Sequence, residues 1–220
     1  VPVNSSSGIS GALGSYSGLA GLAGISLPSG GDEGNSAKAI QKISSLSFFE
    51  NNILTAIHLP DLMAVKSWNS KTNTVAFDEN IYDTSSNKWV RDISDSKQQT
   101  PSAQESFGVF KKHLILNEDK KSGFIDLSIK HQSPYIAKQW VELVVNEVNA
   151  FYRQKDKSES ERAVSYLNQK ISTTSLSEIK EALAQLLQEE TKKLTLIEAN
   201  QFYVFDYIDP PAVMEKKSEP

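Results

Sequence analysis

The chain has 220 residues, enough for one large domain or two small ones. Its 39% of hydrophobic and 23% of charged residues favour a folded globular protein over a disordered one. The net charge of −4 argues against nucleic acid as a partner, because contacts to a phosphate backbone need a basic surface. The absence of cysteine excludes disulfides, thiolate nucleophiles and cysteine-ligated zinc.

Both ends of the sequence predict that it is a piece of a longer protein. The chain begins Val1-Pro2-Val3 without a methionine, and it stops at Pro220 where it has turned polar and proline-rich. No run of about 18 apolar residues occurs, so no segment of this sequence is expected to span a bilayer. Any membrane anchors are expected to lie outside it.

The N-terminal part predicts a glycine-rich segment followed by two short helices. Nine of the 11 glycines lie within residues 8–34, among interspersed leucines, so we expect this stretch to pack in the folded domain rather than act as a flexible linker. A first helix is predicted over residues 36–45. Ser47 and Glu50 have capping-box spacing for a second helix, which Pro60 is expected to end.

The middle of the chain predicts loops, a helix and a β-hairpin. Residues 66–100 are polar, with clusters of Asn, Asp and Ser that favour irregular structure. Ser102 and Glu105 form a second capping-box pattern for a helix that runs to about residue 112. Period-two alternation over residues 113–117 and 124–130, around a turn containing glycine, then indicates a hairpin.

The longest predicted feature is a pair of helices. Ser133 and the proline after it are a strong helix start, and apolar residues recur at helical spacing over residues 134–171 with no Gly or Pro between them. A turn at residues 172–175 precedes a return helix over residues 177–201. The first helix would be about 55 Å long and has a polar middle, so we expect the pair to project from the rest. A strand is predicted over residues 202–208.

These elements predict an α+β fold. We expect an α/β base with a small mixed sheet, formed by residues 1–132 and 202–220, and a long projecting antiparallel helical hairpin over residues 133–201. Segments near the two termini are expected to join one sheet with the strand at 124–130.

No pattern predicts catalysis, a metal site or a cofactor. The histidines lack metal-ligand spacing and are interpreted as surface or edge residues, and the glycine-rich segment lacks the phosphate-binding patterns. The three histidines are His58, His113 and His131. Neighbouring glutamates of the long helices are interpreted as solvated faces; they are Glu159, Glu161, Glu189 and Glu190.

Apolar residues continue along the far part of the first long helix. One return helix covers only part of a helix circumference, so we expect a neighbouring copy of the chain to cover the rest. The candidate contacts of the hairpin and the oligomer are Ala163, Tyr166, Leu167 and Ile171.

Four sequence blocks occur in the order found in a known protein family. They are Gly18-Leu19-Ala20-Gly21-Leu22-Ala23-Gly24-Ile25-Ser26-Leu27; Ser133-Pro134 with Ala137 and Trp140-Val141; Asn149-Ala150-Phe151-Tyr152-Arg153 with Asp156; and Tyr203-Val204-Phe205 with Ile208-Asp209-Pro210-Pro211. Over nearly its whole length the chain resembles the periplasmic domain of the Wzz-type chain-length determinants, also called polysaccharide co-polymerases. The last block is the most specific, because in that family a proline-rich segment directly precedes the second membrane helix.

The resemblance implies a bacterial inner-membrane protein whose periplasmic domain, with a membrane-proximal base, lies between two membrane helices. It implies a homo-oligomeric ring that acts with a polysaccharide polymerase, and with the growing polysaccharide, to set the modal length of O-antigen, capsule or exopolysaccharide. No catalytic residues carry over, so a non-enzymatic protein without cofactors is expected. The alternative is a periplasmic adaptor of an export or efflux assembly, which also uses helical hairpins but surrounds them with β-rich modules. A polysaccharide-modifying hydrolase is the third interpretation.

Overall fold

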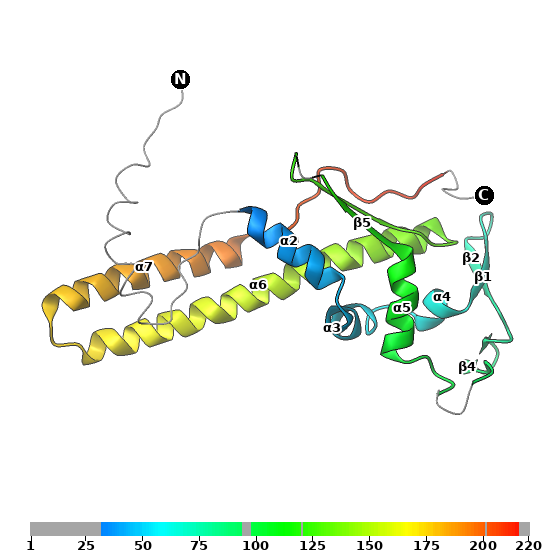
Figure 1. Cartoon of the computed structure of the whole chain (residues 1–220), viewed down its shortest axis with the longest axis horizontal. Helices are drawn as coiled ribbons and strands as arrows, with labels where there is room; N and C mark the ends of the chain where they lie inside the picture. Colours follow the sequence, from blue (N-terminus) through cyan, green and yellow to red (C-terminus); the bar gives the residue numbers. More distant parts are fainter. Residues whose placement is uncertain (1–31, 94–97, 120, 201, 216–220) are drawn as a thin grey trace, which may run out of the picture. The chain divides into compact units, whose positions relative to one another are not determined.

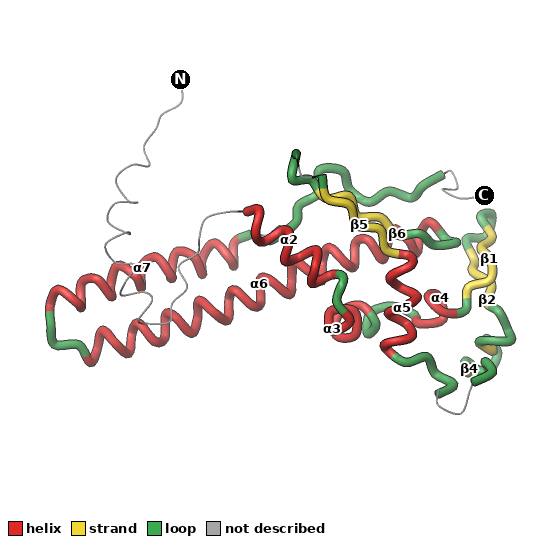
Figure 2. The backbone as a smooth tube through the Cα atoms, in the orientation of Figure 1, coloured by secondary structure: helices red, strands yellow, loops and turns green. Residues whose placement is uncertain are grey.

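The computed structural model describes residues 32–93, 98–119, 121–200 and 202–215, which form an α+β fold dominated by helices (Figure 1). The strands of this described part form three separate two-stranded antiparallel sheets (Figure 2), so the small mixed sheet predicted from the sequence is wrong. The chain divides into two compact units. The larger unit comprises Glu33–Lys155 and Asn200–Pro220. We call the other the hairpin unit; its described residues are Asp32 and Asp156–Ala199.

Short helices open the larger unit, and two predictions about them need correction. Ser45, rather than Ser47, caps the second helix, because the Ser45 hydroxyl accepts a hydrogen bond from the Phe48 N–H. Pro60 begins a helix instead of ending one, since proline fits the first turn, where the N–H has no helical partner. These elements are α2 (Asp32–Ile43), α3 (Leu46–Phe48), the π-helix η1 (Phe49–Ile53) and α4 (Leu59–Met63).

The segment predicted as loops contains two β-hairpins. They pair β1 (Val65–Asn69) with β2 (Thr74–Phe77), and β3 (Tyr82–Asp83) with β4 (Lys88–Trp89). The asparagines that suggested irregular structure belong to the tight turns: Asn73 and Asn87 have φ of 50° and 52°, a left-handed conformation that asparagine tolerates.

The next helix and hairpin are confirmed. Helix α5 (Ala103–His113) begins at the predicted capping box, with Ser102 and Glu105 each bonded to the other's backbone. Strand β5 (Leu114–Glu118) pairs with β6 (Ile125–Ile129) around a turn in which Gly123 has φ of 73°.

Helix α6 (Pro134–Thr173) is unbroken, and α7 (Ser177–Ala199) follows after a three-residue connection. The first half of α6 lies in the hydrophobic core of the larger unit and is therefore not part of the hairpin unit, although the sequence placed the boundary at residue 133. Its buried side chains meet the aromatic residues of the short helices. This core includes Trp140, Val144 and Val148 with Phe48, Phe49, Ile53 and Phe110.

The predicted strand at residues 202–208 is absent, so the described part of the C-terminal segment joins no sheet. A side chain takes the place of a strand partner. The Asn149 Oδ1 accepts hydrogen bonds from the N–H groups of Val204 and Phe205, and its Nδ2 donates to the Phe205 carbonyl. Predictions about the N-terminal strand and about residues 8–31 of the glycine-rich segment lie outside the described residues, and the last three residues of that segment, 32–34, begin α2.

Candidate assembly surface on the hairpin unit

The second half of α6 buries a narrow stripe. Ser160 and Leu167 are fully buried, and Ala163, Val164 and Ile171 are half-buried, while the intervening residues are exposed. The spacing of three and four residues is that of a helix meeting one partner along a seam.

Helix α7 has the matching stripe. Ile197 is buried and Leu183, Leu187 and Leu194 are half-buried. The two helices run antiparallel, because the short connection joins them at one end and Lys157 Nζ lies 2.8 Å from Glu198 Oε1 at the other (Figure 1). The hydrogen bond to Glu198 and its negative charge raise the pKa of Lys157.

The structure separates the four predicted contact residues by role. Leu167 is fully buried within the chain itself, and Ala163 and Ile171 are half-buried on the same stripe. Tyr166 is 39% exposed and has the Lys170 ammonium 5.4 Å from its ring centre. Three of the four therefore lie along the seam of the hairpin, and Tyr166 is the one on the outer surface.

Other apolar side chains of the hairpin unit are more exposed than these. Leu176 and Leu196 are 63% and 62% exposed, and Ile179 is 42% exposed. We call Tyr166, Leu176, Ile179 and Leu196 the outer apolar set. Of this set the sequence analysis named only Tyr166, because Leu176 and Ile179 match helical spacing as well as the seam residues do.

The seam contains polar groups that weaken it. The Ser160 Oγ is buried and has no hydrogen-bond partner. The Glu190 Oε2 is also buried without a hydrogen bond, at 4.0 Å from Lys193 Nζ. A buried polar atom without a partner costs about 1–3 kcal/mol, so the seam is less stable than an apolar one of the same length.

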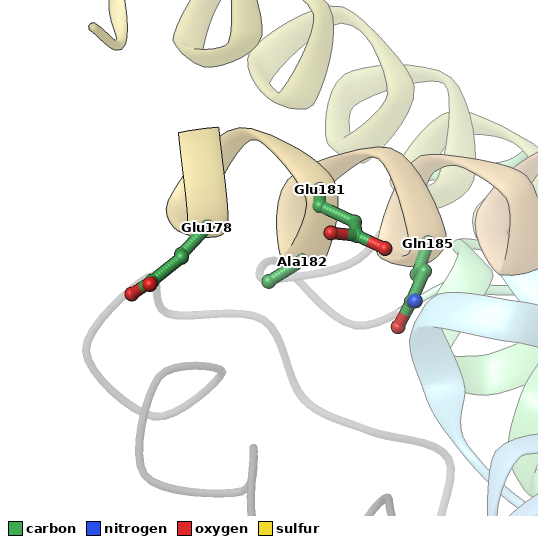
Figure 3. A pocket seen from close by; sticks show the side chains of 4 residues that line it. All are labelled: Glu178, Glu181, Ala182 and Gln185. Carbon is green, nitrogen blue, oxygen red and sulfur yellow. The ribbon is translucent and has the colours of Figure 1, made fainter. Parts of the chain in front are cut away.

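A pocket lies along another face of α7. Figure 3 shows Glu178, Glu181 and Gln185 along one side of that helix, and with Ala182 they line the pocket. The lining residues that lie in the described part of the chain come from this single helix. These described residues place two carboxylates and an amide along one helix face.

The Asn149 contact in the larger unit is the polar feature that the sequence interpretation missed. Asn149 is 5% exposed, and the Arg153 Nη2, one helical turn further, donates to the Asn200 carbonyl at 2.6 Å. Together they hold the segment that follows α7. The signal in the sequence was an asparagine directly after Val148 in an otherwise apolar stripe.

Within the described ranges, no three His, Cys, Asp or Glu side chains are grouped so that they could hold a metal ion. No helix in the same part of the chain is long and apolar enough to cross a membrane. No protein-family model matches the chain, and no curated protein shows significant similarity to it.

Proposed function

We propose that this chain is the periplasmic domain of a bacterial inner-membrane protein that regulates the modal length of a surface polysaccharide. It acts as a homo-oligomeric ring, together with the polymerase and the growing polysaccharide, and it catalyses no reaction itself. Helices outside this sequence anchor it in the inner membrane. The product is O-antigen, capsule or exopolysaccharide.

One observation carries the proposal: two of the sequence blocks on which the resemblance rests contact each other directly. Asn149 in the block Asn149-Ala150-Phe151-Tyr152-Arg153 bonds to the backbone of Val204 and Phe205, although Asn149 and Phe205 are 56 residues apart. A third block supplies Ser133, which caps α6. Because these blocks contact each other or cap the long helix, they support the interpretation that all three belong to one fold.

The helical hairpin supports an assembly role. Helix α6 continues for 40 residues and α7 returns for 23, and these helices with their connection expose the outer apolar set. Apolar side chains of this size contribute roughly 1.5–3 kcal/mol each when a partner buries them. A neighbouring copy of the chain is the proposed partner.

The first test is deletion of the gene in the bacterium that carries it, followed by electrophoresis of the surface polysaccharide. We expect the modal length to be lost while polymer is still made. The full-length gene should restore the mode. An unchanged length distribution contradicts the proposal, and loss of all polymer favours the export adaptor or an enzyme instead.

A second comparison tests the outer apolar set. The full-length variant Tyr166→Asp/Leu196→Asp should shift or broaden the length distribution, because both side chains are exposed in the single chain. The control Gln169→Asp/Gln188→Asp adds the same charge at exposed polar sites of the same helices and should leave the distribution unchanged. Equal behaviour of the two variants, at equal expression, argues against these contacts.

A further inference from the structure

His131 lies at a junction of three elements in the larger unit. It falls between the end of β6 and the start of α6, and its Nε2 is 2.9 Å from the Asp61 carbonyl in α4. Its ring meets Trp140 edge-on, with 5.1 Å between ring centres. The interpretation of all three histidines as surface or edge residues is therefore wrong for His131, which is half-buried and bonded on both sides.

The two backbone contacts define which nitrogen carries the proton. A carbonyl can only accept, so the His131 Nε2 must donate its hydrogen to Asp61. The Ser133 N–H, 2.9 Å from the His131 Nδ1, can only donate, so Nδ1 must be unprotonated. The contacts therefore fit the neutral ring with hydrogen on Nε2, because a protonated Nδ1 could not accept from the Ser133 N–H.

Ser133 links this ring to the start of the long helix. Its hydroxyl accepts from the Ile136 N–H and its carbonyl accepts from the Ala137 N–H, so Ser133 is the N-cap of α6. Ser133 is 1% exposed, and water therefore cannot replace a lost partner for its N–H.

We propose that His131 is a proton-sensitive joint that holds the start of α6 to α4 when neutral and releases it when protonated. A proton on Nδ1 would face the Ser133 N–H, donor against donor. Among the described residues, the Ser133 carbonyl is the acceptor within reach of that proton, 3.3 Å away, and it already receives the first helical hydrogen bond of α6. Protonation thus removes the hydrogen bond from the Ser133 N–H, and it competes with the hydrogen bond from the Ala137 N–H to the Ser133 carbonyl.

The charges around the ring act in both directions. His113 at the end of α5 lies 6.4 Å away between ring centres and repels a charged His131, whereas the Asp61 carboxylate attracts it. The Asp61 carboxylate is shared with His58, 3.3 Å away, and Lys130 is the adjacent residue on the chain. Burial outweighs the attraction and the backbone contacts, and it lowers the pKa of His131.

The sign of the pH effect follows. In the unfolded chain His131 titrates near pH 6.5, whereas the folded chain keeps it neutral to lower pH. Its contribution to stability is complete above about pH 6.5 and declines as the pH falls toward the folded pKa. Each unit between the two pKa values changes the unfolding equilibrium about tenfold. This inference is independent of the proposed function, because it depends only on contacts within the larger unit.

NMR titration of the His131 ring nitrogens in the intact chain tests the joint directly. We expect the Nε2–H form at pH 7.5, a titration midpoint below 6.5, and movement of the Ser133 amide signal with the same midpoint. Ring nitrogens with hydrogen on Nδ1, or a midpoint at or above that of an unfolded peptide, overturn the proposal.

Amide exchange of the variants provides the second readout. Corrected for intrinsic rates, exchange at Ile136 and Ala137 should accelerate relative to Val148 between pH 7.5 and pH 5. His131→Gln, which does not titrate, should remove this pH dependence, and His58→Gln at an exposed ring should preserve it. Should the glutamine variant not fold, the wild-type titration still decides; an unchanged pH dependence in a folded His131→Gln contradicts the joint.

Discussion

The two halves of α6 belong to one unbroken helix, yet they are buried in different ways. In residues 134–155 the stripe is wide and apolar, with Trp140, Val144, Val145 and Val148 all nearly inaccessible to solvent. In residues 156–173 only Ser160 and Leu167 are buried to that degree. Continuity of the backbone therefore does not imply uniform stability along it.

The difference reflects the number of partners that each half has. The first half packs with side chains from α2, α3, η1, α5 and β6 in one core. The second half has α7 beside it, joined through a narrow seam that includes buried polar atoms without hydrogen bonds. Local opening begins where few apolar contacts hold an element, so we expect the hairpin unit to exchange amides before the core of the larger unit does.

Replacement of Leu167 by alanine should have the largest effect on the hairpin unit. Leucine-to-alanine changes at fully buried sites cost about 2–5 kcal/mol, and Leu167 is the only fully buried large apolar side chain in the described part of this unit. Native-state hydrogen exchange should show the loss in residues 160–171 and 183–197.

The matched variant is Trp140→Ala in the first half of the helix, where the cost should be about 3–5 kcal/mol. Its effect should appear at Phe49, Phe110 and Val144, which share its core. If both variants weaken the same amides equally, the two halves are not energetically distinct and the comparison fails.

Asn149→Ala should have a smaller effect, confined to the larger unit. The variant removes three hydrogen bonds to the 204–205 backbone, and we expect a loss of about 1–2 kcal/mol, because water can reach part of that segment. The N–H groups of Val204 and Phe205 should lose protection from exchange.

Asn146→Ala is the control, since Asn146 is an exposed asparagine on the same helix. It should change neither the stability of the unit nor the exchange of those two amides. Retained protection at Val204 and Phe205 in Asn149→Ala would mean that the C-terminal segment has another anchor.

What the sequence predicted well are the features encoded by neighbouring residues. The capping box at Ser102, the start of α6 at Ser133 and the turn at Gly123 depend on side chains within a few positions of each other. The strand expected at residues 202–208 failed for the opposite reason. Its run of apolar and aromatic residues is typical of a strand. Its hydrogen-bonding partner, however, is the Asn149 side chain, and no local pattern specifies a partner 56 residues away.

The candidate surface shows the same limit. Helical periodicity correctly placed Ala163, Leu167 and Ile171 on one stripe, but it could not decide whether that stripe meets α7 or another copy of the chain. Burial of Leu167 decides that the stripe is internal, and it moves the proposed contacts to the outer apolar set. The contacts of His131 were missed because its partners, Asp61 and Ser133, act through backbone atoms that composition does not reveal.

The smallest expected effect has the opposite sign, and it concerns the polar group in the seam. The Ser160 Oγ is fully buried with no hydrogen-bond partner, so Ser160→Ala removes an unsatisfied group with little change in volume. Alanine also has the higher helix propensity. We expect the hairpin unit to gain about 1 kcal/mol, measured as slower exchange of amides along the seam, with no change at Val148.

The control Ser165→Ala, at an exposed serine of the same helix, should gain only the propensity difference of a few tenths of a kcal/mol. Equal gains from the two serines would mean that burial of the Ser160 hydroxyl costs no stability. The seam would then hold the second half of α6 as strongly as an apolar stripe of the same width would.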